Sequence, residues 1–182
     1  LPPSPYVVEL ERLFTSELAS CIIRTPPQLS PIASIDTPGC VADWRTQLDF
    51  TTKIFRARGL HLDDRHVRHA GGESFSASIV DLALYVVNNY QQLRQSGSSI
   101  VLYLPKIQTA EEAALWNDLL SALERHLGLA IGTIKVYVLV EQIEACFQLM
   151  EIRAALGTRF VGFNTGRWDY INSVSDAMAW DE

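Results

Sequence analysis

Charged side chains stand at the ends of several apolar runs in this sequence, and these are the positions at which we expect chemistry. Arg56 and Arg58 close the first run, Glu141 directly follows the third, and the fourth leads into residues 162–170, which include Asp169. In parallel βα folds, ligands bind at the carboxyl ends of the strands. If these runs are strands of one parallel sheet, their charged ends should lie together at one edge of it.

Glu141 and Asp169 are the candidate ligands of a metal ion. Two carboxylates from neighbouring strand ends, with an arginine across the mouth, could hold one hard divalent cation and present it to a small oxyanion. Mg²⁺ suits such a pair because it binds few protein carboxylates and keeps positions for water and substrate oxygens. The alternative is structural: Glu141 caps the following helix, and Asp169 pairs with Arg167 or another basic residue. The residues alone leave both interpretations open.

Other kinds of site are not indicated by the sequence. The histidines at positions 61, 66 and 69 match no standard zinc spacing, so the polar stretch over residues 61–78 is expected to be a solvated loop. Gly71, Gly72 and Gly157 lack the order of a dinucleotide-binding or P-loop motif. No serine, cysteine or histidine has the context of a nucleophile elbow.

The elements that must position the charged residues alternate along the chain. Short apolar runs predict strands at residues 53–58, 98–104, 133–140 and 160–163. Helical periodicity predicts helices over 79–93 and 145–156, and Thr109 with Glu112 forms a capping-box pattern before a third helix that reaches Leu127. This β-α-β-α-β-α-β order predicts an α/β fold with a parallel sheet, either half a barrel or a small open sheet.

The length of 182 residues predicts one main domain and is too short for a complete (β/α)8 barrel of about 250 residues. Residues 1–40 are expected to form an N-terminal helix and a proline-rich connector, and residues 41–182 the βα units that carry the metal site. Because the sequence starts with Leu rather than Met, we expect it to be a piece of a longer protein.

The charge balance restricts the class of partner. With 15 Lys and Arg against 21 Asp and Glu, the net charge is −6, which argues against a nucleic-acid or membrane-surface binder. Cys21, Cys40 and Cys146 form no CxxC pair and are expected to be reduced thiols. We therefore expect a cytoplasmic protein, with the peroxisome or glyoxysome as the alternative compartment.

Four ordered motifs resemble malate synthase, in particular its shorter form, over residues 53–171. The family's Arg-x-Arg-Gly-Trp/Leu-His-Leu segment is matched at 56–62, its Tyr-Leu-Pro-Lys segment at 103–106, its Gly-Thr-Ile-Lys and Leu-Ile-Glu segments at 132–135 and 139–141, and its Gly-Leu-Asn-x-Gly-Arg-Trp-Asp-Tyr-Ile signature at 162–171. The resemblance implies a TIM-type (β/α)8 barrel, of which this chain carries a part.

The resemblance also implies an acyltransferase activity: Mg²⁺-dependent Claisen condensation of acetyl-CoA with glyoxylate, giving malate and CoA. Carried over by motif, Glu141 and Asp169 would ligate Mg²⁺, and Arg56 would stabilise the enolate oxygen and the aldehyde. The glyoxylate carboxylate would be held by the backbone amides of Gly166, Arg167, Trp168 and Asp169.

Two departures from the family pattern leave alternatives open. The family's general base is an Asp from a carboxy-terminal helical domain, and no residue here takes that role by motif; residues 172–181 also depart from the family's continuation. One alternative is a CoA-thioester lyase of the citrate lyase β-subunit or malyl-CoA lyase type. Another is a non-catalytic remnant that pairs with another chain or with itself through exposed sheet edges.

Overall fold

The computed structural model describes residues 54–180, and a parallel sheet organises them. The sheet has four strands in the order β1-β4-β5-β6: β1 (Phe55–Arg56), β4 (Val101–Leu104), β5 (Lys135–Val140) and β6 (Phe160–Thr165). Every neighbouring pair is parallel, with Arg56 opposite Tyr103 and Val140 opposite Thr165. All four strands therefore end at the same edge of the sheet, as the sequence predicted.

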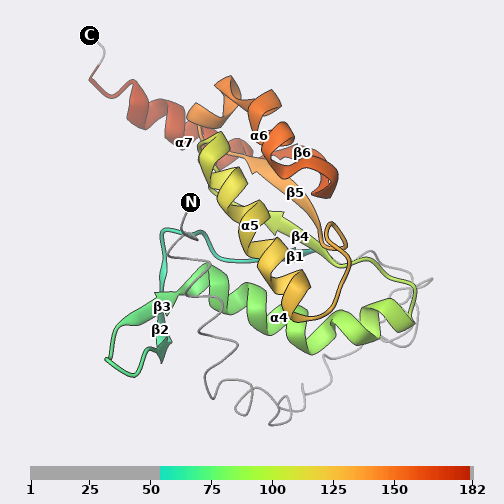
Figure 1. Cartoon of the computed structure of the whole chain (residues 1–182). Coiled ribbons are helices and arrows are strands. Elements are labelled where there is room, and N and C mark those ends of the chain that lie inside the picture. The colour runs from blue at the N-terminus through green and yellow to red at the C-terminus, as the bar shows by residue number, and fades with distance from the viewer. Residues whose placement is uncertain (1–53, 181–182) are drawn as a thin grey trace, which may run out of the picture.

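Helices alternate with these strands along the chain (Figure 1). They are α4 (Ala77–Gln95), α5 (Ala110–His126), α6 (Leu149–Leu156) and α7 (Arg167–Ala177), with 3-10 turns η1 (Glu144–Phe147) and η2 (Gly157–Arg159). The predicted class of parallel βα units is confirmed, and residues 54–180 form an open sheet rather than a closed barrel. None of the helices in this range is long and apolar enough to span a membrane. The expected N-terminal helix, the proline-rich connector, Cys21 and Cys40 lie outside the described residues.

The prediction of a loop over residues 61–78 is wrong. A two-stranded antiparallel hairpin forms there from β2 (Asp63–Arg68) and β3 (Ser74–Ser76), and α4 starts directly after it. Asp64 is buried, and its Oδ1 accepts hydrogen bonds from the amides of His66 and Val67. The strand was not predicted because most of its side chains are charged and exposed, which hides the alternation that indicates a strand.

One apolar core joins the helices to the sheet. Trp116, Leu119 and Leu123 on α5 are fully buried in the same cluster as Leu102 of β4 and Val136 of β5. These helix positions recur at three- and four-residue spacing, so they form one apolar face, which packs on the side of the sheet that carries Leu102 and Val136. The core therefore fixes where β4 and β5 lie relative to α5, and so also the positions of the residues that follow these strands.

The start of α5 follows its sequence signal. Thr109 accepts a hydrogen bond from the amide of Glu112, and the Glu112 carboxylate accepts in return from the amide of Thr109, which completes the capping box. The single helix expected over residues 145–156 is instead divided: Gln148, with φ of −130°, separates η1 from α6. The Gln148 side chain accepts from the amide of Ala110, so this break ties the start of α6 to the start of α5.

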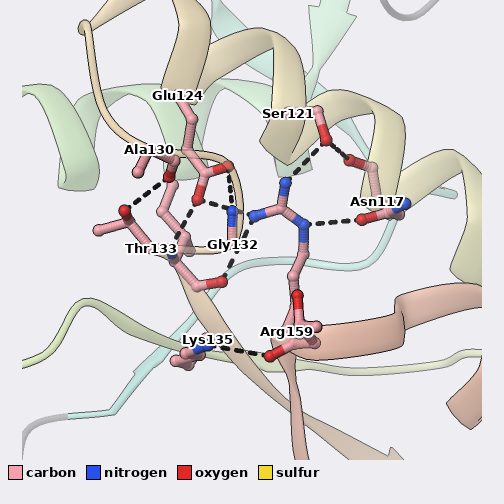
Figure 2. A network of polar contacts seen from close by, with 10 residues as sticks. Asn117, Ser121, Glu124, Ala130, Gly132, Thr133, Lys135 and Arg159 are labelled. Carbon is pink, nitrogen blue, oxygen red and sulfur yellow. Dashed lines mark hydrogen bonds and ion pairs between the residues drawn. The ribbon is translucent and has the colours of Figure 1, made fainter.

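A buried ion pair joins α5 to the turn before β6 (Figure 2). Arg159 is 1% exposed and donates to Glu124 at 2.7 Å, to Asn117 at 2.7 Å and to Ser121 at 2.7 Å. The Glu124 carboxylate also accepts from the amides of Gly132 and Ile134, just before β5. Every nitrogen of the guanidinium and every oxygen of the carboxylate thus has a partner. The pair lies at the amino ends of β5 and β6, away from the strand ends that carry Glu141 and Asp169.

Candidate active site

Charged residues from four successive βα units converge at the carboxyl ends of the strands. Arg56 at the end of β1 has its Nη2 3.6 Å from Oε1 of Glu141, the residue after β5. Lys106, two residues past β4, has its Nζ 2.9 Å from Oδ2 of Asp169 in the first turn of α7. Three of these residues, Arg56, Glu141 and Asp169, were singled out from the sequence, and the structure brings them together.

Glu141 lies at the bottom of this group and is completely buried. Its Oε1 accepts a hydrogen bond from the amide of Lys106 at 2.8 Å. Its Oε2 is buried without a hydrogen-bond partner among the described residues. Glu141 does not cap the following helix, because η1 has Ile143 at its N-cap and no side-chain cap. A buried carboxylate oxygen without a donor is costly, and a bound cation is one way to satisfy it.

Asp169 is positioned by the turn from β6 into α7. Its ionic partner is Lys106, whereas Arg167 lies over the ring of Trp168, with its Cζ 4.8 Å from the ring centroid. Trp168 is 74% exposed. The expected alternative that Asp169 pairs with a basic residue is thus realised, but with a lysine from another βα unit rather than with Arg167.

Gly166 allows α7 to begin directly against Glu141. A Cβ at this position would lie 2.9 Å from Cβ of Glu141, closer than real Cβ atoms approach, and 3.2 Å from its Oε2, which is also a tight contact. The Gly166 amide donates to the carbonyl of Val140. The next three residues form the first turn of α7. Their amides have no acceptor within the helix, and such a helix start favours anions. Any carboxylate bound here would therefore meet the amides of residues 167–169 rather than that of Gly166.

The two carboxyl groups influence each other. Burial raises the pKa of Glu141, and the close approach of Asp169 raises it further. The pKa of Asp169 is lowered, first by its contact with Glu141 and then by Lys106. A proton shared by the pair therefore belongs to Glu141, and it would supply the donor that Oε2 otherwise lacks. A cation at this place would take over the same role and release that proton.

Arg58 and His69 do not take part in this group. Arg58 donates to Asp81 on α4 and to Asp64 on β2, and so holds the hairpin against α4. His69 stacks on Phe75, with ring centroids 3.6 Å apart. Within residues 54–180 there is no group of three or more His, Cys, Asp or Glu residues that could hold a metal. Glu141 and Asp169 offer two carboxylate groups, with a hollow beside Asp169, and such an oxygen donor set would suit Mg²⁺ rather than zinc.

Lys106 is the residue that sequence reasoning missed. The sequence predicts a strand over residues 98–104 and no candidate residue at its end, although Lys106 lies two residues further on, within the Tyr-Leu-Pro-Lys segment. Two hollows flank the site, of about 340 and 300 Å³, and Lys106 lines both. The first also contains Leu60, His61 and Gln108, and the second contains Asp169.

Comparison with known proteins gives consistent matches. Residues 52–179 match the family model described as malate synthase, TIM barrel domain. Malate synthase A of Escherichia coli is 48% identical over 66% of this chain and 22% of its own length. The bifunctional glyoxylate cycle protein of Caenorhabditis elegans is 49% identical over 65% of the chain and 12% of its own length. Glyoxysomal malate synthase of Brassica napus is 40% identical over 69% of this chain and 23% of its own length. The match thus spans less than a quarter of each of these relatives.

Proposed function

Since this chain belongs to the malate synthase family through its TIM-barrel domain, we propose that it carries the magnesium and glyoxylate site of an acyltransferase that condenses acetyl-CoA with glyoxylate to give malate. The observation that carries the proposal is that Glu141 and Asp169 meet at the carboxyl ends of β5 and β6. Oε2 of Glu141 has no hydrogen-bond partner among the described residues, and the Lys106 ammonium lies near both carboxylates. In such folds, residues at this edge of the sheet do the chemistry.

Each residue has a role that its position supports. Glu141 and Asp169 would hold Mg²⁺, and the ion when bound would polarise the aldehyde of glyoxylate. The glyoxylate carboxylate would bind at the first turn of α7, where Arg167, Trp168 and Asp169 supply backbone amides toward the positive end of the helix dipole. Gly166 contributes the close approach that its missing Cβ permits, since its own amide is used by Val140.

Arg56 would stabilise the negative charge that develops during condensation. Its guanidinium lies 3.6 Å from Glu141 and is held near the face of Tyr103, with Cζ 5.9 Å from the ring centroid. Its side chain is 49% exposed, so it faces the open side of the site, where an acetyl group would arrive. A fixed cation placed at a developing enolate oxygen is a major source of rate enhancement. Removal of the methyl proton needs a base, and we assign it to no residue of this chain.

The test is therefore ligand binding rather than turnover. We would titrate Mg²⁺ calorimetrically into the wild-type protein, then glyoxylate with and without Mg²⁺, and repeat these titrations with Asp169→Asn. The expected result is binding of glyoxylate only with Mg²⁺, and an affinity for Mg²⁺ that falls at least about tenfold in Asp169→Asn, the loss that even outer partners of metal ligands cause. Asp118→Asn, an exposed residue on α5, makes the same chemical change far from the site and should leave both affinities unchanged. Unchanged Mg²⁺-dependent binding of glyoxylate by Asp169→Asn would refute the assignment.

The alternatives are separated by other measurements. A CoA-thioester lyase would use the same carboxylates, and release of acetyl-CoA from malyl-CoA would reveal it. Self-association stays a prediction as well: β1 and β6 are the edge strands of the described sheet, and an unpaired edge is a site for strand pairing. Sedimentation of the chain would show whether it forms oligomers. The compartment, cytoplasm or glyoxysome, is likewise still a prediction.

A further inference from the structure

Lys106 has an unusual backbone. Its φ is 58°, and it is the one residue other than glycine with a positive φ within residues 54–180. The left-handed region is disfavoured for residues with a Cβ, and such residues persist where surrounding contacts hold them, often at functional sites. Here Pro105 on one side and the capping box of α5 on the other fix the loop. The conformation turns Lys106 so that both its amide and its side chain reach the candidate metal ligands.

The contacts of Lys106 are with both carboxylates. Its amide donates to Oε1 of Glu141 at 2.8 Å, and its Nζ lies 3.8 Å from Oε2 of the same residue. The same Nζ is 2.9 Å from Oδ2 of Asp169. The ammonium thus stands beside the two oxygens that the proposed function gives to Mg²⁺. Two carboxylates so close together repel each other when both are ionised, and a cation between them removes that repulsion.

We propose that Lys106 is a placeholder for the metal: in the metal-free protein its ammonium is the counterion of Asp169 beside Glu141, and it leaves Asp169 when Mg²⁺ binds. This inference rests on the proposed function of the site. The side chain has freedom to move, since it is 31% exposed and lines the hollows on both sides of the carboxylates. A lysine stem has four flexible carbons, so the ammonium can move while the amide of Lys106 keeps its hydrogen bond to Glu141.

The placeholder predicts two effects of opposite sign in Lys106→Met. The metal-free variant should unfold at a lower urea concentration, because Asp169 loses its counterion while Glu141 keeps only Arg56. The same variant should bind Mg²⁺ more tightly, by at least about fivefold, which is the effect of one unit charge at about 4 Å even in bulk water. A lysine that only shapes the site would give effects of the same sign, since its removal would lower both the stability and the affinity for Mg²⁺.

Lys135→Met is the matched control. It removes the same charge from the amino end of β5, where the Lys135 ammonium donates to the carbonyl of Thr158, and it should change the dissociation constant for Mg²⁺ less than twofold. Calorimetric titration of Mg²⁺ into the three proteins measures the affinities, and urea unfolding without Mg²⁺ measures the stabilities. Lys106→Arg keeps the charge and should show no tightening.

A second measurement uses the wild-type protein, so it does not depend on the folding of a variant. An amine-acetylating reagent should modify Lys106 faster when Mg²⁺ is saturating, while the rate at Lys135 stays constant; mass spectrometry of the peptides gives both rates. If the wild type binds Mg²⁺ and neither the reactivity of Lys106 nor the affinity of Lys106→Met rises, the placeholder is refuted and the metal site stands. If neither the wild type nor Lys106→Met binds Mg²⁺, the proposed site is refuted and the placeholder with it.

Discussion

The buried pair of Arg159 and Glu124 should be a main source of stability, and its two halves should not be equivalent. Removing one partner of a buried ion pair costs about 3–5 kcal/mol because the other charge is left uncompensated. In Arg159→Met, the Glu124 carboxylate keeps two donors, the amides of Gly132 and Ile134. We therefore expect the free energy of unfolding to fall by about 3 kcal/mol, the lower end of this range. Glu124→Leu leaves a buried guanidinium and also two amides without an acceptor, each costing about 1–3 kcal/mol. We expect this variant to lose about 5 kcal/mol or more.

Urea unfolding followed by circular dichroism would measure these losses as shifts of the midpoint. The double variant Glu124→Leu with Arg159→Met should be more stable than the sum of the two losses predicts, because no charge is then left alone. Arg125→Met is the control, since Arg125 is the exposed neighbour of Glu124 and its loss should cost less than about 0.5 kcal/mol. The reasoning is refuted if Arg159→Met costs more than Glu124→Leu, or if both cost no more than Arg125→Met.

Two further changes test the site and the hairpin. Gly166→Ala should weaken Mg²⁺ binding in calorimetry by about tenfold and lower the stability by about 1–3 kcal/mol, because the new Cβ would press on Glu141 2.9 Å away; unchanged binding would show that the close approach is unimportant. Asp64 has its pKa lowered to about 2, first by the amide of Val67 and then by Arg58. The contribution of the ionised Asp64 to the free energy of unfolding is therefore complete above pH about 4 and is lost as the pH falls toward 2. This contribution amounts to about 1–2 kcal/mol. Acid unfolding of Asp64→Asn should lack this part of the pH dependence, and an unchanged profile would contradict it.

The sequence predicted those parts of the fold whose signals are local. The strands β4 and β5 are apolar runs of the length that a covered strand needs, and the start of α5 is set by Thr109 and Glu112, three residues apart. Their alternation was enough to predict a parallel sheet, and that prediction placed Arg56, Glu141 and Asp169 at one edge. Arg56 ends β1, Glu141 directly follows β5 and Asp169 lies in the turn of helix after β6, so an error of one or two residues in a strand boundary did not matter.

The parts that were missed depend on contacts between distant residues. Lys106 reaches Glu141 across 35 positions, and it does so through a left-handed backbone that no neighbouring residue type signals. Arg159 and Glu124 are also 35 positions apart, and either residue alone would be assigned to the surface. Burial of such a pair can be known only when the helix and the turn that carry them have been placed against each other.

The loop of residues 105–109 has a consequence for how this protein can be changed in length. Ile107 is buried, and the amides of Lys106, Gln108 and Thr109 are all engaged by the carboxylates of Glu141 and Glu112. An insertion here would break these bonds and displace Lys106. The tip of the hairpin is different, because Gly71 and Gly72 have no neighbouring atoms where a side chain would extend. Added sequence, such as a tag or a fluorescent label, should be accepted at this tip and rejected between β4 and α5, in evolution as well as in the laboratory.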